Sequence, residues 1–134
     1  MSYPFVLKEK GIQDITTVDI REDSKADIKA NYLSWSPPKE FDLIITNPPF
    51  ALAEKVISKS LAIVKQNGFV VMLLRLNFFG SAGRFPFWTQ NPAKYAFVHH
   101  KRMSFTPDGK TDSIEYMHAV WQKGYKGMTQ LKVL

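Results

Sequence analysis

A short apolar segment that ends at two consecutive prolines most constrains how this chain can fold. Phe41–Thr46 is apolar apart from Asp42, as expected for a parallel strand covered on both faces. The segment stops at Asn47-Pro48-Pro49, because proline has no amide donor and forces the residue before it into an extended conformation. The sequence therefore predicts a buried strand that ends in a stiff loop.

The segments after this loop predict a crossover to a second buried strand. From 51 to 66 apolar residues recur with helical spacing, and Asn67-Gly68 supplies a helix-ending signal. The apolar segment 69–76 follows. A strand, a helix and a strand in this order indicate an α/β sheet with a right-handed crossover.

The flanking segments add strands to this sheet. We expect strands at 14–20 and 28–35, a loop with a short helix at 80–91, and an antiparallel hairpin of 94–102 and 113–122 at one edge. The fold class predicted is thus α/β, a mostly parallel sheet with an antiparallel C-terminal hairpin. A length of 134 residues predicts one domain, spanning 1–134.

Composition excludes several classes of site. The chain has no cysteine and three scattered histidines, so we predict no disulfide and no metal site. The first ten residues do not resemble a secretory signal, and the longest apolar run, 69–79, is too short to span a bilayer. We expect a soluble, cytoplasmic protein that does not bind membranes. The net charge of +6 favours contact with a polyanion.

The loop Asn47-Pro48-Pro49-Phe50 lies at the carboxyl end of a buried strand, where ligands of open α/β sheets bind. An aromatic amine is a poor nucleophile, and oxygens of Asn47 and Pro48 can accept both of its N–H bonds and orient it. The prolines stiffen the loop, and Phe50 offers a flat face for an extruded base. The alternative is a turn that only terminates the strand.

Together with the segments 74–81 and 102–105, this loop resembles the DNA N6-adenine methyltransferases of the class I, Rossmann-like fold, especially their small phage forms. The resemblance covers about residues 14 to 124. It implies S-adenosylmethionine as the cofactor and an adenine-containing DNA duplex as the partner, with Asn47, Pro48, Pro49 and Phe50 as catalytic residues.

The resemblance also implies a cofactor site upstream. Asp19 and Ile20 match the strand end that binds the ribose or methionine part, and Asn31, Tyr32 and Leu33 match the segment that contacts the cofactor adenine. The alternatives are a solvated surface carboxylate for Asp19 and a turn-forming role for Asn31.

A third group of residues is predicted to contact the substrate. Polar residues inside an apolar strand either pair internally or emerge at the rim of a site; Arg75 fits either description, and Asn77 is assigned to the rim. Cations in the loops can meet phosphates, although isolated ones are commonly only solvated. The predicted substrate-binding residues are Asn77, Ser81, Arg84, Arg102 and Lys110.

Other aromatic and imidazole side chains are given ordinary roles. Trp35, Trp88 and Trp121 are predicted to pack, with Trp88 the best candidate for stacking on a base. His99-His100 and His118 are interpreted as ordinary residues of the hairpin.

One part of the family pattern is missing. The family opens with a strand and a Gly-rich turn that holds the methionine end of the cofactor, whereas Gly11 stands alone here. We therefore expect an N-terminally truncated domain with a gap in the sheet centre. Candidates to fill the gap are Met1–Leu7, Met128–Leu134, a partner subunit or second copy, and direct pairing of the flanking strands.

The sequence predicts a DNA adenine-N6 methyltransferase and leaves two alternatives open. One is methylation of another planar amine, such as an RNA base or a glutamine amide. The other is a non-catalytic nucleic-acid-binding remnant or fragment that has lost its cofactor site. A motif match is a hypothesis until its structural context is known.

Overall fold

The computed structural model describes every residue of the chain except 1–2, 13, 20, 22 and 102–114. Two compact units divide the chain, Met1–Lys39 and Glu40–Leu134, and each is described by itself. The predicted site residues Ile20, Arg102 and Lys110 lie outside the described residues, and the single domain stays a prediction.

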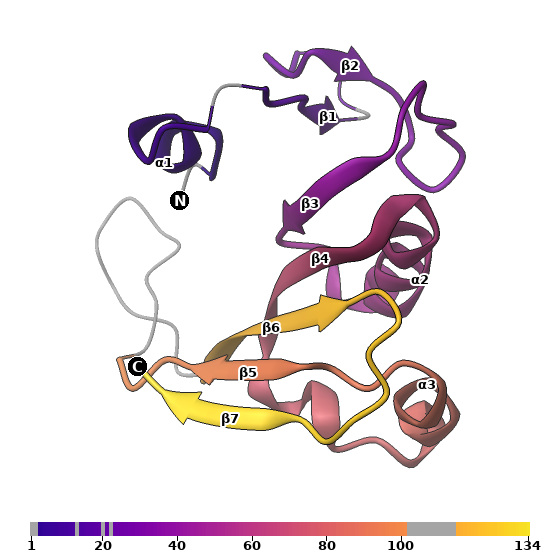
Figure 1. Cartoon of the computed structure of the whole chain (residues 1–134), viewed down its shortest axis with the longest axis vertical. Coiled ribbons are helices and arrows are strands. Elements are labelled where there is room, and N and C mark those ends of the chain that lie inside the picture. The colour runs from indigo at the N-terminus through magenta and orange to yellow at the C-terminus, as the bar shows by residue number, and fades with distance from the viewer. Residues whose placement is uncertain (1–2, 13, 20, 22, 102–114) are drawn as a thin grey trace. The chain divides into compact units, whose positions relative to one another are not determined.

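The first unit is made of one short helix and two short strands: α1 (Tyr3–Glu9), β1 (Val18–Asp19) and β2 (Ile28–Lys29) (Figure 1). β1 and β2 pair in parallel, so their carboxyl ends lie at the same edge. Both strands are shorter than the segments 14–20 and 28–35 that the sequence predicts. Thr17 and Asp27 directly precede the paired residues, and hydrogen bonds between them also hold the two strands together.

The second unit is a five-stranded sheet in the order β3-β4-β6-β5-β7 (Figure 1). Its strands are β3 (Phe41–Thr46), β4 (Val64–Arg75), β5 (Tyr95–Val98), β6 (Tyr116–Gln122) and β7 (Gln130–Val133). Parallel pairing joins β3 to β4 and β5 to β7, and antiparallel pairing joins β6 to both β4 and β5. Four strands therefore point one way and β6 the other, which confirms the predicted α/β fold class.

The predicted hairpin forms as the antiparallel pair β5 and β6, but it does not lie at the sheet edge. β7 covers β5 and is itself the edge strand, with Gln130 donating its amide to the carbonyl of Lys94 (3.0 Å). All four residues of β7 are exposed, so the segment carried no burial pattern that could reveal a strand.

Two candidates for filling the gap in the sheet take other positions. The C-terminal segment forms β7, at the opposite edge of its sheet from β3. The N-terminal segment contains α1, a helix. A partner subunit and direct pairing of the flanking strands stay predictions.

The crossover helix is shorter than the sequence predicts. α2 (Ala53–Ile63) follows the 3-10 turn η1 (Phe50–Leu52), and β4 begins at once at Val64. The Asn67-Gly68 signal does not end the helix. It produces an irregularity in β4, where the pairing with β3 shifts between Phe41 and Leu43 and Asn67 takes a φ of 66°.

The remaining elements follow β4. They are the 3-10 turns η2 (Leu76–Phe79) and η3 (Ala82–Arg84) and the helix α3 (Phe85–Gln90). This agrees with the loop and short helix that the sequence predicts at 80–91.

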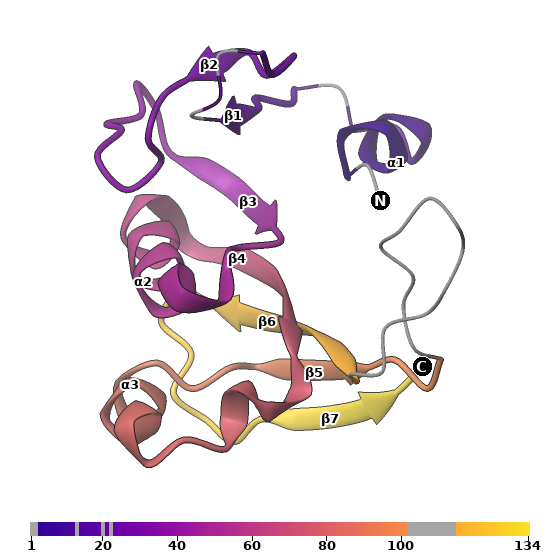
Figure 2. The same ribbon diagram turned by 180° about the vertical axis from the view of Figure 1, so that it is seen from behind.

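One face of the sheet carries the core. Alternate residues of β4 and β6 on this face are almost fully buried, as the strand period of two requires: Val70, Met72, Leu74, Met117, Ala119 and Trp121. α3 packs against this face through Phe87 and Trp88, whose rings contact Trp121. α2 packs against β4 and lies in front of it in the view from behind (Figure 2).

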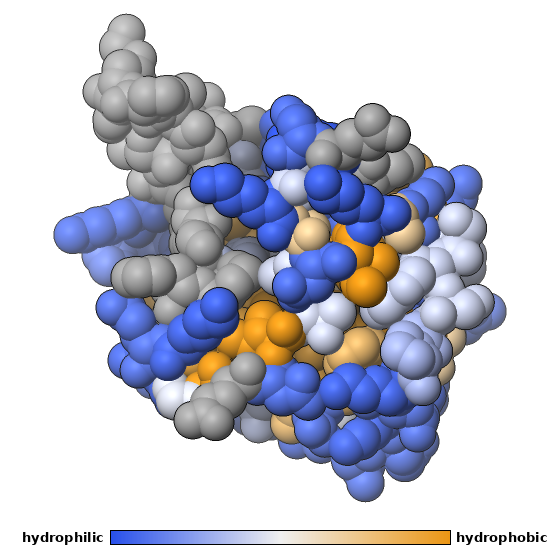
Figure 3. Space-filling view, turned by 90° about the horizontal axis from the view of Figure 1, so that it is seen from above, coloured by the Kyte–Doolittle hydropathy of each residue, from blue (hydrophilic) through white to orange (hydrophobic). Residues whose placement is uncertain are grey.

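The surface is mainly polar on the face seen from above, where apolar atoms occupy smaller areas (Figure 3). Within the described part of the chain, no helix is both long and apolar enough to cross a membrane. The same residues contain no group of three or more histidine, aspartate or glutamate side chains that could hold a metal ion.

The close packing around Gly68 gives a first prediction. A Cβ at this position would lie 2.7 Å from Val64 Cγ2, 2.8 Å from the Lys65 carbonyl oxygen and 3.0 Å from the Asp42 carbonyl oxygen. Because two of these atoms belong to the backbone, we expect Gly68→Ala to lower the free energy of unfolding by about 1–3 kcal/mol. Urea unfolding followed by tryptophan fluorescence measures this change.

Gly83→Ala is the matched control, because its Cβ would meet nothing nearer than Ser81 Oγ at 3.7 Å. Its unfolding midpoint should stay close to that of the wild type. Equal midpoints for the two variants would show that the irregularity at Gly68 does not need a glycine.

Candidate active site

The loop after β3 is held in one conformation by local bonds. Pro48 is buried, and Pro49 is extended with φ −57° and ψ 137°. Leu52 donates its amide to the carbonyl of Pro49 (3.0 Å), and Ala53 donates to the carbonyl of Phe50. These two turn bonds fix the path from strand to helix without using the carbonyl of Pro48.

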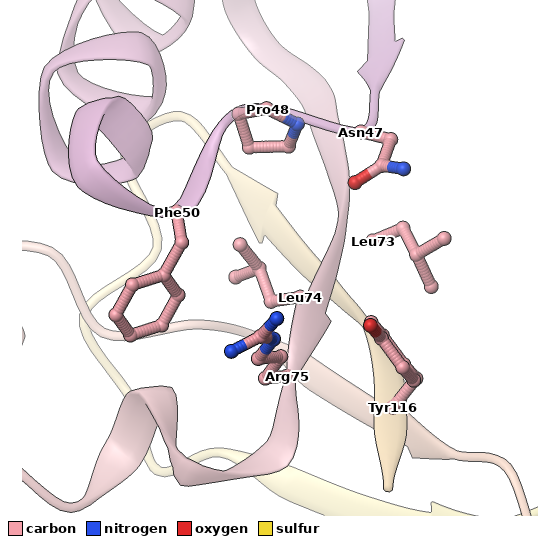
Figure 4. A pocket seen from close by; sticks show the side chains of 7 residues that line it. All are labelled: Asn47, Pro48, Phe50, Leu73, Leu74, Arg75 and Tyr116. Atoms are coloured by element: carbon pink, nitrogen blue, oxygen red, sulfur yellow. The ribbon is translucent and has the colours of Figure 1, made fainter. Parts of the chain in front are cut away.

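A pocket of about 160 Å³ opens where this loop meets the ends of β4 and β6 (Figure 4). It is several times the about 30 Å³ that one water molecule occupies in the liquid. Its lining residues are Asn47, Pro48, Phe50, Leu73, Leu74, Arg75 and Tyr116. Three of the four predicted catalytic residues therefore line one cavity, and the fourth, Pro49, lies exposed between them.

Asn47 presents a free carboxamide at this pocket. The residue is exposed, and its side chain makes no hydrogen bond with any residue that the structure describes. A carboxamide oxygen and a peptide carbonyl are both hydrogen-bond acceptors. Asn47 and Pro48 thus offer two acceptors from adjacent positions, which suits an NH₂ group that has two hydrogens to donate.

The ring of Phe50 is partly exposed, at 42%, yet held from behind. It packs edge-on against Phe78, with the ring centres 6.3 Å apart. The guanidinium carbon of Arg84 lies 4.8 Å from the centre of the Phe50 ring and 4.3 Å from that of Phe78. That of Arg75 lies 5.7 Å from Phe50. Rings attract cations in this range, so Phe50 is positioned by two arginines and one buried ring.

Behind Phe78 lies an aromatic cluster that ties this region to the core. Trp88 stacks on Phe79 at 4.9 Å and on Trp121 at 5.9 Å. Trp121 is 1% exposed and donates its indole N–H to the carbonyl of Asn91, so it packs as predicted. Trp88 has a ring on each side and a buried Nε1 without a hydrogen-bond partner among the described residues. Packing therefore describes Trp88 better than base stacking does.

The predicted substrate residues occupy different places. Asn77 in η2 and Ser81 before η3 are exposed and do not line the pocket. Arg84 is half-buried against two rings, and its Nη1 lies 3.5 Å from the carbonyl of Phe78. The pocket also contains Arg75 and Tyr116, which the sequence analysis did not assign to the site. A charged residue at the end of an apolar strand was the available signal for Arg75.

The predicted cofactor residues belong to the first unit. Asp19 ends β1, and Asn31 follows β2 by two residues, so both stand at the carboxyl ends of paired parallel strands. Asn31 Oδ1 accepts a hydrogen bond from the Leu33 amide (3.1 Å), as in a turn. Tyr32 packs with Trp35, with the ring centres 6.4 Å apart.

Asp19 is paired with Arg21. The Arg21 amide, Nε and Nη2 donate to the carboxylate at 3.1, 3.2 and 3.0 Å. These bonds and the positive charge of Arg21 lower the pKa of Asp19 below its usual value. The carboxylate therefore stays ionised and can accept hydrogen bonds, as a ribose diol requires.

A pair of histidines bridges β5 and β6, which the sequence analysis did not foresee. His99 Nε2 and His118 Nδ1 lie 2.6 Å apart. Burial, and then the neighbouring His99, lower the pKa of His118. No described acidic side chain joins them in a metal-binding group, and an ordinary role in the hairpin stays a prediction.

Comparison with known proteins identifies the fold. No protein-family model and no curated protein matches the chain. A Listeria monocytogenes protein assigned to the class I S-adenosylmethionine-dependent methyltransferases is 13% identical, with a TM-score of 0.57 over 76% of this chain and 39% of that one. A predicted O-methyltransferase of Agrobacterium tumefaciens is 20% identical, with a TM-score of 0.54 over 88% and 51%.

The chain spans about half the length of these structures or less. The likeness shows a Rossmann-like fold of the methyltransferase type, and it agrees with the sheet described above.

The contact between Arg21 and Asp19 gives a second prediction. Replacing Arg21 by methionine removes the side-chain donors and the charge, so Arg21→Met should raise the pKa of Asp19 towards the usual aspartate value of about 3.9. Because the folded-state pKa is lowered, the pair stabilises the fold above the usual pKa, and this contribution is lost as the pH falls through the folded-state value. Carboxyl-carbon NMR titration measures the shift.

Lys39→Met is the control, because Lys39 lowers the pKa of Asp14 through a 2.8 Å contact. That variant should raise the pKa of Asp14 and leave Asp19 unchanged. An unchanged Asp19 pKa in Arg21→Met would contradict the pairing.

Proposed function

We propose that this chain acts as an S-adenosylmethionine-dependent methyltransferase on the N6 amino group of adenine in DNA. One observation carries the proposal: Asn47, Pro48 and the partly exposed ring of Phe50 line one pocket at the carboxyl end of a strand. The methyltransferase type of the fold supports it.

The chemistry of an exocyclic amine explains this choice of side chains. Its lone pair is delocalised into the ring, so the amine must be oriented before it can attack. Acceptors at Asn47 and Pro48 hold the two N–H bonds and turn the lone pair out of the ring plane, which is positioning combined with electrostatic stabilisation. Phe50 stacks on the base and keeps its plane fixed. No general base enters this scheme.

The residues of the first unit fit part of the cofactor. The ionised Asp19 suits the ribose hydroxyls, and the segment Asn31–Leu33 follows the neighbouring strand end. S-adenosylmethionine, when bound, supplies the methyl sulfonium that the amine attacks. The chain has no glycine between Gly11 and Gly68, so no Gly-rich turn lies between β1 and β3 to hold the methionine end.

Charge favours a nucleic-acid substrate such as DNA over an amide in a protein. The net charge of +6 suits a polyanion, for which phosphate contacts provide much of the affinity. Two arginines contact the ring of Phe50, and one of them, Arg75, lines the pocket itself. A glutamine amide in a protein gives such cations no phosphate to bind.

The role of Asn47 is tested by comparing binding with transfer. Because its acceptor acts on the amine and not on the cofactor, Asn47→Ala should lower kcat for methyl transfer to an adenine-containing duplex by about two to three orders of magnitude. Calorimetric titration with S-adenosylmethionine should give the same affinity as the wild type.

Two variants control this experiment. Asn47→Asp keeps an acceptor oxygen and should retain measurable transfer. Asn91→Ala removes an asparagine side chain that bonds to the carbonyl of Phe87, outside the pocket, and should leave transfer unchanged. Loss of cofactor binding together with transfer in Asn47→Ala would refute the assigned role. A wild-type chain that binds DNA but no cofactor would be a non-catalytic remnant.

Stacking by Phe50 is tested by comparing substrates. An extruded base loses its neighbours in the duplex, which costs a few kcal/mol, and the ring offsets part of this. Since base–aromatic stacking contributes about 1–3 kcal/mol, Phe50→Ala should raise KM about tenfold more for a paired adenine than for a mismatched one.

Phe85→Ala is the matched control, because Phe85 is 71% exposed but does not line the pocket. We expect it to use both substrates as the wild type does. An equal effect of Phe50→Ala on paired and mismatched adenine would argue against stacking.

A further inference from the structure

Arg75 lies where the strand ends meet the pocket. It is the last residue of β4, it pairs with Tyr116 of β6, and it lines the cavity together with Asn47 and Phe50. In Figure 4 its guanidinium extends from the end of β4 towards the Phe50 ring. The position puts a cation beside the acceptors that would hold a base.

The charge of Arg75 has no carboxylate partner among the described residues. Their ion pairs join Arg21 to Asp19, Lys39 to Asp14 and Lys65 to Asp42. The contact of the Arg75 guanidinium with Phe50, at 5.7 Å, is with the ring. A half-buried guanidinium that lines a pocket and has no counter-ion among the described residues can form charge-assisted hydrogen bonds to an anionic ligand.

The other arginine that contacts Phe50 is placed differently. Arg84 contacts the rings of both Phe50 and Phe78, and its Nε is buried without a hydrogen-bond partner among the described residues. Its guanidinium is therefore packed into the wall behind Phe50. Arg75, whose guanidinium lines the cavity, is the arginine placed to meet an entering ligand.

We infer that Arg75 binds a phosphate next to the target base, so that the site recognises a nucleotide within a strand and not an isolated base. This rests on the proposed function, because it assumes that the base amine lies at Asn47. A nucleotide that turns into a pocket rotates about its backbone, which leaves its flanking phosphates at the mouth. The planar fork of arginine matches two phosphate oxygens at once.

Neutralising the two phosphates that flank the adenine tests this directly. The probe is a fluorescently labelled oligothymidylate with one adenine, and its partner probe carries methylphosphonates on both sides of that adenine. We expect the wild type to bind the partner probe about tenfold more weakly, because a charge-assisted hydrogen bond is lost. Arg75→Gln should bind both probes equally, and the salt dependence of its log affinity should be smaller by about 0.7.

Two further variants keep the result interpretable. Lys132→Gln removes one exposed cation on β7, outside the pocket, and should preserve the tenfold ratio. Arg75→Lys keeps the charge but loses the fork, and should reduce the ratio to a few-fold. Circular dichroism and the thermal midpoint check that each variant is folded.

The outcomes separate the inference from the proposed function. A tenfold ratio that persists in Arg75→Gln, or no binding of the adenine probe by the wild type, overturns the inference. Displacement by free deoxyadenosine monophosphate as effective as displacement by the unlabelled strand overturns the assignment to a strand. These measurements need no cofactor. If the wild type shows the tenfold difference in affinity between the probes but no methyl transfer, the proposed function is refuted and the phosphate contact of Arg75 stands.

Discussion

The parallel pairing of β3 with β4 fixes the geometry on which the candidate site depends. Thr46 pairs with Met72, so the chain leaves β3 beside the last three residues of β4. This register places Asn47 next to the end of β4, and the pairing of β4 with β6 brings Tyr116 opposite Arg75. A slip of one residue would exchange the two faces of β4 and expose its buried side chains. The packing of the core therefore also sets the position of the loop.

The packing of Arg84 connects the ring of Phe50 to the core of the sheet. Phe78 is fully buried and contacts both Phe87 and Trp88, so it is a fixed surface. Arg84 lies against Phe78 and Phe50 together, which connects a partly exposed ring to the core of the sheet. The buried Nε of Arg84 is an unfavourable feature. The contacts of Arg84 nevertheless hold the Phe50 ring in place without a bound base. A ring that is already oriented can position a base for reaction.

The sequence was most informative where local chemistry decides the structure. Pro48 and Pro49 cannot continue a strand, and β3 has the bounds predicted from them, Phe41–Thr46. Asn67-Gly68 is compatible with either a helix end or a strand irregularity, and only the pairing of β4 with β3, which is distant in sequence, separates the two. β7 has no buried side chain and hence no pattern. Arg75 stayed ambiguous because its surroundings include Tyr116, forty-one positions later in the sequence.

The proposed division of roles follows the division of the chain. The acceptors, the ring and the arginines that would receive a target base all belong to Glu40–Leu134, whereas Asp19 and Asn31 belong to Met1–Lys39. Target binding and cofactor binding would then draw their free energy from separate sets of side chains. Transfer needs both ligands in place at once, so neither set of side chains would support it alone.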